Sequence, residues 1–394
     1  MKFIPGIDGL RGIAVLLVIF HHSPFSFLHL SFGWIGVQVF FVLSGFLITS
    51  ILLKEKEEHS FTSFIKRFYI KRSLRIFPAY YFYLAIIACF IYVEYTLNAE
   101  KPKAQSNFFE LKQYWTYLVT YTYNFAKLIS SCEGIQTGSS VIVSHLWSLS
   151  VEEQFYIFFP PIVYFTSRRT LNIVAIIFFF LVPFLRWTFY HFFVSTGISP
   201  EGALSIGVYQ STITQSDALL TGAILALNKE SFSLRSKYLF FLFTALLVAY
   251  PVIQFFLNEK TFLHSAIGFG HIGSLLDNSQ YIYVFTWINV LSVLFILGII
   301  KNASWSAFLD WKLLRYVGKI SYGMYLYHNL IKYLFIYIVF YKVPFINLFM
   351  ADIKSNYVTQ SLIFVLYLSI VFLVSHISFV YMESKFLKYK SLLT

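Results

Sequence analysis

The stretch that decides the fold is residues 8–22, which read DGLRGIAVLLVIFHH. It is apolar apart from Asp8, Arg11 and the two histidines at its end. The apolar run from 9 to 28 has about the 20-residue length that a helix needs to cross a bilayer. Ionisable groups are costly inside a membrane and usually serve a function there, so Arg11 and His22 are the first candidate site residues.

The spacing of Arg11 and His22 places both on one side of that helix. Eleven steps of about 100° return a side chain to within roughly 20° of its starting direction, and a rise of about 1.5 Å per residue separates the two groups by about 16 Å. His21 points about 100° away, and we interpret it as a packed or helix-end histidine. The first helix is therefore interpreted as one wall of a catalytic channel.

The composition places the whole chain in a membrane. Of its 394 residues, 58% are hydrophobic and 21% aromatic, while only 12% are charged. This balance excludes an ordinary soluble domain and indicates a polytopic, all-α membrane protein. The net charge of +12 does not by itself indicate nucleic acid as a partner, because Lys and Arg gather in the cytoplasmic loops of membrane proteins. No metal-ligand spacing occurs, so we expect no metal.

Ten apolar segments approach the length of a transmembrane helix. We place them at 9–28, 34–53, 77–96, 145–165, 171–190, 209–227, 238–257, 281–300, 320–341 and 357–381. Lys and Arg number 21 in the segments on the N-terminal side of the membrane and 7 in those on the opposite side. By the positive-inside rule, this bias predicts that both termini are cytoplasmic. We expect one integral-membrane domain over 1–394, without an appended soluble domain.

The long external segment at about 97–144 has two distinct parts. An amphipathic aromatic stretch runs from Phe108 to Phe125, and a run rich in Gly and Ser follows at 130–140. These features are typical of an interfacial helix and a flexible loop near an external substrate. A simple tether between two spans explains them equally well.

A basic cluster lies between the second and third predicted spans. Residues 63–78 read SFIKRFYIKRSLRIFP, so that Lys71, Arg72 and Arg75 recur at helical spacing. Guanidinium groups bind phosphates through paired, charge-assisted hydrogen bonds, which makes the cluster a candidate phosphate clamp. On sequence alone, the cluster is more often the positive anchor that multispan proteins carry on their cytoplasmic side.

The fourth predicted span opens with two adjacent carboxylates in HLWSLSVEEQFY, residues 145–156. Glu152 and Glu153 would lie about 10 Å inside the outer face, where a carboxylate is expensive. His22 is predicted at a similar depth, so we expect its ring to meet Glu152. A carboxylate that orients an imidazole suits general-base chemistry, and the same pair would equally serve as a proton relay in a transporter.

The ninth and second predicted spans also carry small and polar residues. Ser321, Tyr325 and His328 share one face of the ninth span at i, i+4 and i+7. We expect them to line the inner half of the channel or to form hydrogen bonds between helices. Small residues such as Gly45 in the second span favour close packing of helices.

Together these motifs resemble the acyltransferase-3 family of membrane O-acyltransferases. The hallmark of that family is an Arg or Lys separated by ten residues from a His, matched here by Arg11 and His22. Also similar are FFVLSGFLI at 40–48, RSLRIFP at 72–78, WSLSVEEQFY at 147–156, ISYGMYLYH at 320–328 and, in a degraded form, the closing Tyr-x-x-Glu region at 381–383. The matches follow one another in order over nearly the whole chain.

The resemblance implies transfer of an acyl group, usually acetyl, from cytoplasmic acyl-CoA to a glycan hydroxyl at the outer face of a bacterial inner membrane. The implied acceptors are a polysaccharide, a lipopolysaccharide or a lipid-linked saccharide, in a protein surrounded by membrane lipids. His22 with Glu152 would perform the proton chemistry, and Arg72 and Arg75 would hold the phosphates of acetyl-CoA.

The distance of about 16 Å between Arg11 and His22 suits the extended pantetheine arm of such a donor. Arg11 would contact the donor near its entrance, or would instead pair with Asp8 on the same helix. The catalytic candidates are therefore His22, Glu152 and Arg11. The donor-binding candidates are Arg72, Arg75, Lys71, Ser321, Tyr325 and His328.

The chain departs from the family pattern in two places. The family usually carries Arg-x-Asp at the start of the sixth span, where this chain has Gln215 and Asp217. We therefore expect Arg186, near the outer end of the fifth span, to be the partner of Asp217 in a structural ion pair. Some members carry an external esterase-like domain that completes the transfer. None is visible here, so either the membrane domain delivers the acyl group directly or a separate protein passes it on.

The competing function is a proton-coupled transporter or flippase of a glycan intermediate, which would use the same buried charges as a proton relay. Many such transporters are built from inverted repeats with interrupted spans in matching positions. The sequence shows neither feature, and we expect an enzyme.

Overall fold

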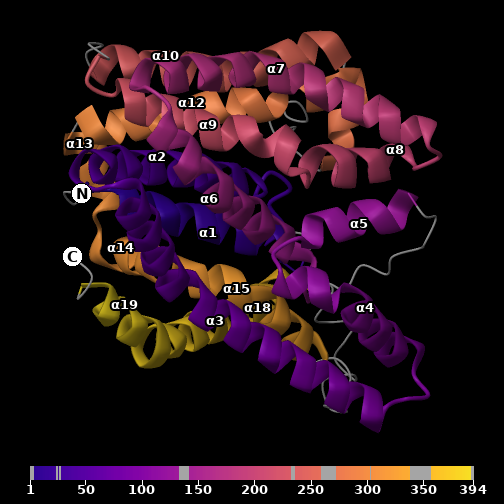
Figure 1. The fold of residues 1–394 in the computed structure, drawn as a ribbon. Coiled ribbons are helices and arrows are strands. Elements are labelled where there is room, and N and C mark those ends of the chain that lie inside the picture. Colours follow the sequence, from indigo (N-terminus) through magenta and orange to yellow (C-terminus); the bar gives the residue numbers. More distant parts are fainter. Residues whose placement is uncertain are drawn as a thin grey trace.

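A computed structural model of the chain is helical throughout the part that it describes (Figure 1). The structure describes residues 4–23, 25, 28–132, 142–231, 236–258, 272–301, 303–337 and 356–391. Within these ranges it contains no β-strand, in agreement with the all-α class that the composition predicts. Most of the Gly- and Ser-rich run at 130–140 lies outside the described residues.

Helices make up most of the described part of the chain. In chain order they are α1 (Ile7–His21), α2 (Ile35–Glu58), α3 (Phe61–Leu97), α4 (Pro102–Val119), α5 (Tyr123–Cys132), η2 (Ser144–Leu146), α6 (Trp147–Phe165), α7 (Arg168–Ser195), α8 (Pro200–Gly202), η3 (Ala203–Tyr209), α9 (Thr212–Asn228), α10 (Ser236–Asn258), η4 (Ile272–Ile282), α12 (Val284–Lys301), α13 (Ala303–Leu309), α14 (Lys312–Lys319), α15 (Ser321–Tyr337), α18 (Tyr357–Ser378), η6 (Phe379–Glu383) and α19 (Ser384–Ser391).

Each of the ten predicted spans contains a helix, but the lengths of these helices differ. In the described part of the chain, five helical stretches are long and apolar enough to cross a membrane, namely α2, α3, α7, α12 and the run from Tyr357 to Tyr389. α1 has only 15 residues, and α9 and α15 have 17 each. The structure supports a multi-pass membrane protein, while the number of ten crossings stays a prediction.

The basic stretch between the second and third predicted spans is helical and not a loop. α3 continues for 37 residues from Phe61 to Leu97, with Pro78 inside it, and only His59 and Ser60 separate it from α2. Lys and Arg are good helix formers, so the helix extends beyond its apolar part. The predicted phosphate clamp therefore lies on a rigid element.

Figure 1 shows α1 near the middle of the bundle. On one side of α1 and α2 lie α9, α12, α7 and α10, and on the other side lie α14, α15 and α18 (Figure 1). The beginning of α1 and the end of α19 lie toward the same end of the bundle, at the left of the picture. This arrangement agrees with an even number of crossings, but which side of the membrane that end faces stays a prediction.

Two glycines let neighbouring helices approach closely. A Cβ atom at Gly45 in α2 would lie 1.8 Å from the carbonyl oxygen of Leu219 in α9. A Cβ atom at Gly318 in α14 would lie 1.6 Å from the carbonyl oxygen of Asp8 in α1. Any larger residue would push these helices apart, which confirms that Gly45 serves close packing.

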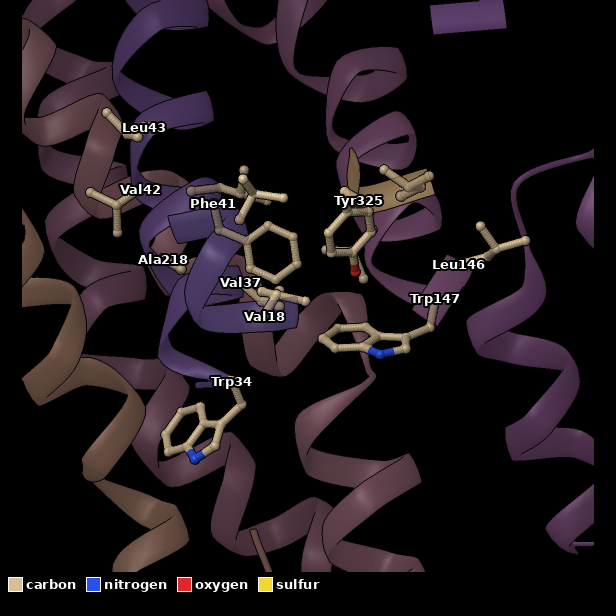
Figure 2. Close-up of a cluster of buried hydrophobic side chains, with 14 of the residues drawn as sticks. Val18, Trp34, Val37, Phe41, Val42, Leu43, Leu146, Trp147, Ala218 and Tyr325 are labelled. Atoms are coloured by element: carbon tan, nitrogen blue, oxygen red, sulfur yellow. The ribbon is translucent and has the colours of Figure 1, made fainter. Parts of the chain in front are cut away.

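Buried apolar side chains fill the space between α1, α2, α6, α9 and α15 (Figure 2). Val18 of α1, Phe41 of α2, Trp147 of α6 and Tyr325 of α15 are each less than 10% exposed. The rings of Phe41 and Trp147 lie edge to face with their centroids 6.0 Å apart. This packing fixes the relative positions of the helices that carry the predicted site residues.

Candidate active site

A cavity of about 930 Å³ lies between α1, α2, α3, α6 and α15. Of the predicted site residues, it is lined by Arg11, Lys71, Arg72, Arg75, Glu152, Ser321 and Tyr325. Seven basic residues line it in all, with Lys54, Arg67 and Lys229 as the other three. The acidic residues are Asp8, Glu55, Glu58, Glu152 and Glu153, so the lining has a net positive charge. Such a lining favours an anionic ligand.

Three guanidinium groups face one carboxylate inside this cavity. The charges of Arg72, Arg11 and Arg75 all act on Glu152. Arg11 also lies 3.9 Å from a carboxylate oxygen of Asp8, the helix pair that the sequence offers as its alternative role. Among the residues that the structure describes, Arg72 and Arg75 form neither an ion pair nor a hydrogen bond, and the guanidinium of Arg72 stacks 4.5 Å above the ring of Tyr156. Their N–H donors are therefore available to a ligand.

Glu152 is held by hydroxyl groups. The Ser44 Oγ atom donates to Glu152 Oε1 at 2.5 Å, and the Tyr156 hydroxyl donates to Ser44 Oγ at 3.1 Å. These bonds tie α6 to the Ser-Gly-Phe segment of α2. Glu152 is thereby fixed beside the arginines, where its charge partly offsets theirs.

Lys71 is already engaged within the protein. Its Nζ atom lies 3.0 Å from Glu55 Oε1, and Arg67 Nε lies 3.4 Å from Glu55 Oε2. His59 Nε2 lies 3.3 Å from the same carboxylate. Glu55 thus contacts the basic side chains near the α2–α3 turn. Lys71 is therefore a weaker candidate than Arg72 or Arg75 for a contact with the acyl donor.

The inner end of the cavity is formed by α6 and α15. The Tyr325 hydroxyl contacts the Ser148 Oγ atom and donates to the backbone carbonyl of His145 at 3.0 Å. The Ser321 Oγ atom is buried and lacks a hydrogen-bond partner among the described residues. A buried hydroxyl without a partner is unfavourable, so a ligand in the cavity would complete its bonding.

His22 does not line the cavity. Its Nδ1 atom is 3.0 Å from the Val18 carbonyl oxygen and 3.1 Å from His328 Nε2. The ring of His328 lies 5.7 Å from that of Tyr325, measured between centroids. His328 therefore lies next to both His22 and the cavity-lining Tyr325.

The expected contact between His22 and Glu152 is absent from the described structure, and the prediction of that pair is wrong. Glu152 instead lies near Arg11, which precedes His22 by eleven residues on α1. The cause is a difference in tertiary packing, since Ser44 holds Glu152 toward α2 while the Val18 carbonyl turns the ring of His22 toward α15. The partner of His22 is His328, which the sequence places with the donor-binding residues.

Sequence reasoning missed the role of His145 and Asn329 around this pair. His145 Nε2 lies 3.1 Å from the carbonyl oxygen of Leu326, and its Nδ1 atom lies 3.0 Å from Asn329 Nδ2. The ring centroids of His145 and His328 are 4.9 Å apart. His145 is the first residue of a predicted span. A titratable residue inside a membrane is costly and usually functional, and this feature of the sequence could have pointed to His145.

The expected partner of Asp217 is confirmed. Arg186 Nη2 lies 2.5 Å from Asp217 Oδ1, and both side chains are fully buried. Gln215, where the family usually has Arg, instead accepts from Gln38 Nε2 at 2.7 Å. The pair joins α7 to α9 and does not line the cavity, which indicates a structural role.

Fold and site together define a helical membrane protein with a positively charged internal cavity and, near it, a hydrogen-bonded pair of histidines of which His328 is buried. The model of the Acyl_transf_3 family, described as an acyltransferase domain, matches residues 4–380. The chain belongs to this acyltransferase family.

Relatives with curated names agree with the family. The peptidoglycan O-acetyltransferase OatA of Listeria monocytogenes is 30% identical over 351 residues, covering 83% of this chain and 49% of the relative. The O-acetyltransferase OatA of Staphylococcus aureus is 29% identical over 336 residues, covering 83% of this chain and 50% of the relative. The chain spans about half the length of the curated relatives that it matches. No solved structure matches it.

Proposed function

We propose that the protein transfers an acetyl group from acetyl-CoA, bound from the cytoplasm, to a hydroxyl group of a glycan at the outer face of a bacterial inner membrane. Membership of the acyltransferase family supports the reaction class. The printed name of one relative, a peptidoglycan O-acetyltransferase, supports a cell-surface glycan as the class of acceptor. The proposal covers the chain 1–394 as one membrane domain.

The observation that carries the donor assignment is the pair Arg72 and Arg75, which line the cavity with unused hydrogen-bond donors. Acetyl-CoA carries a pyrophosphate and a further phosphate, and guanidinium groups bind phosphate oxygens through paired, charge-assisted bonds. The cavity volume of about 930 Å³ is at the upper end of ligand sites, which are about 300–1,000 Å³. Arg11 would contact the donor near its entrance, with Glu152 limiting the excess positive charge.

Ser321 and Tyr325 would contact the pantetheine arm at the inner end of the cavity. The Ser321 hydroxyl has no hydrogen-bond partner among the described residues, and it would donate a hydrogen bond to a carbonyl group of the arm. Tyr325 lines the cavity and lies next to His328, the partner of His22, and its side chain would move to let a thioester reach the imidazole. Movement of Tyr325 would break its contacts with Ser148 and the His145 carbonyl.

His22 would act as the general base in the transfer. Its imidazole takes the proton of the acceptor hydroxyl while the oxygen attacks the thioester carbonyl. A carbon–oxygen bond forms, the carbon–sulfur bond breaks, and the departing thiolate receives the proton from the imidazolium. The products are the acetylated glycan and free CoA, and the base is restored.

The test compares neighbouring histidines in the intact protein. His22→Ala should abolish glycan acetylation, measured as loss of the 42 Da acetyl increment, about the mass of C2H2O, by mass spectrometry of surface glycans. His21→Ala is the matched control, because it removes the neighbouring imidazole, whose Nδ1 atom contacts the Leu30 carbonyl oxygen at 3.0 Å, and leaves His22 in place. Both variants must appear in the membrane at wild-type levels. Normal acetylation in the folded His22→Ala protein would refute the role of His22 as the base.

A further inference from the structure

The hydrogen-bond partners of His22 fix which of its nitrogens carries a proton. Its Nδ1 atom lies 3.0 Å from the Val18 carbonyl oxygen, which can only accept. The same carbonyl accepts from the His22 backbone N–H at 3.1 Å. Nδ1 is therefore the protonated nitrogen of the neutral ring, and Nε2 carries the lone pair.

His328 is fixed in the complementary state by the same reasoning. Its Nδ1 atom lies 2.6 Å from the Tyr325 carbonyl oxygen, so Nδ1 carries the proton. The Nε2 atom of the neutral ring then has a lone pair, and it faces His22 Nδ1 at 3.1 Å. The His22 Nδ1–H group is shared between the Val18 carbonyl and His328 Nε2.

The neighbouring His145 has hydrogen-bond partners of its own. His145 Nε2 donates to the Leu326 carbonyl, so its Nδ1 atom accepts from the Asn329 amide, and His145 does not compete for the proton between His22 and His328. His328 is fully buried and its ring is bonded at both nitrogens, which prevents it from turning.

We propose that His328 is the positioning residue for the catalytic base. By accepting from His22 Nδ1–H, it holds the imidazole in the tautomer and orientation that present Nε2 to the acceptor hydroxyl. The same bond gains strength when Nε2 takes the proton and the His22 ring becomes positively charged. His328 thereby takes the role that the sequence predicts for Glu152. The inference rests on the proposed function, since it needs His22 to be the base.

Two substitutions separate this role from packing. In His328→Gln, the longer amide reaches the position of Nε2 and offers an oxygen to His22 Nδ1–H. In His328→Asn, the shorter amide can still donate to the Tyr325 carbonyl, but it offers no acceptor at the position of Nε2. Both replacements are polar and similar in size, so they disturb the buried site to a comparable degree.

The measurement is steady-state transfer by the purified, full-length protein in nanodiscs, with folding checked by size-exclusion chromatography. We expect His328→Asn to lower kcat by about 10²-fold, the lower range for a general base, with the KM for acetyl-CoA unchanged. His328→Gln should stay within roughly tenfold of the wild type, because a neutral hydrogen-bond acceptor is restored. If His328→Asn does not fold, His328→Leu removes the same acceptor and takes its place in the comparison.

Three results would overturn the inference: equal losses in the Asn and Gln variants, full activity of a folded Asn or Leu variant, or a change confined to KM. The last result would return His328 to the donor-binding set. The variants His145→Gln and His145→Asn are the matched control. Any activity that they lose should be explained by the smaller amount of folded protein alone. Activity in folded His22→Ala would mean that the proposed function has failed at the base itself. An inactive His22→Ala beside an active His328→Asn would mean that only the inference about His328 has failed.

Discussion

The buried pair of Arg186 and Asp217 allows a sharp test of the packing of α7 against α9. Asp217→Leu removes the carboxylate and leaves the Arg186 guanidinium without its counter-ion. Both side chains are fully buried, and Arg186 Nη2 lies 2.5 Å from Asp217 Oδ1. The Thr286 hydroxyl on α12 donates to Asp217 Oδ2 at 2.6 Å, so the substitution also removes the acceptor of this hydrogen bond.

The expected magnitude follows from the isolation of the remaining charge. Removing one partner of a buried ion pair lowers the free energy of unfolding by about 3–5 kcal/mol. Arg186 keeps its bonds to the Thr214 carbonyl at 2.8 and 3.1 Å, but these neutral acceptors do not balance its charge. Arg186→Met should cost about as much, since it leaves the Asp217 carboxylate alone.

The double variant Arg186→Met, Asp217→Leu removes both charges and refills the space with apolar groups. Replacing a buried ion pair in this way is often close to neutral, although here the Thr214 and Ile282 carbonyls lose the N–H groups that they accept from. We expect the double variant to lose far less stability than the sum of the two single changes. The coupling free energy should be about 3 kcal/mol or more.

The assay is denaturant or thermal unfolding of the detergent-solubilised protein, followed by tryptophan fluorescence for all four members of the cycle. Glu201→Ala is a suitable control, because Glu201 is exposed and should change the free energy of unfolding by no more than about 0.5 kcal/mol. Additive effects of Arg186→Met and Asp217→Leu would refute the reasoning, since they would show that the two side chains do not stabilise each other.

Two further predictions concern the donor site and the packing of the bundle. The double variant Arg72→Gln, Arg75→Gln should weaken acetyl-CoA binding by about 10²-fold or more in isothermal titration calorimetry, because each charge-assisted hydrogen bond contributes about 1.5–3 kcal/mol. Lys71→Gln should weaken binding less, since Glu55 already holds the Lys71 ammonium group. Unchanged binding in the double variant would exclude the phosphate clamp. Gly45→Ala should lower the free energy of unfolding by about 1–3 kcal/mol or more, because its Cβ atom would lie 1.8 Å from a backbone oxygen of α9; a folded Gly45→Ala protein of wild-type stability would show that the two helices can separate freely.

The pattern of the first helix was informative because it depends on geometry within one element. The 100° step of an α-helix places Arg11 and His22 on one side, and the structure puts Arg11 in the lining of the cavity and His22 outside that lining. The search for a counter-ion of Asp217 succeeded for a similar reason. A membrane interior requires a partner for a charge, and Arg186 was the available cation in the neighbouring span.

The basic cluster shows a different limit of sequence reasoning. The residue types and the helical spacing of Arg72 and Arg75 were visible, but they fit a membrane anchor as well as a phosphate clamp. The structure adds that both side chains line a cavity and that neither is bonded within the described residues. Whether the N–H groups of Arg72 and Arg75 are free to bind a ligand depends on the side chains around them. The spacing of residues along the chain does not show this.

The amino-acid sequence alone determined the class of protein, the positions of its most apolar helices and the residues that are expensive to bury, since these depend on composition, periodicity and the cost of charge in a membrane. Only the tertiary structure decided the partner of His22. Depth estimates suggested Glu152, whereas close contacts such as those at Gly45 and Gly318 set the neighbours of each helix and brought His328 to His22. Contacts between helices depend on how their surfaces fit together, and that fit is specified by many residues at once.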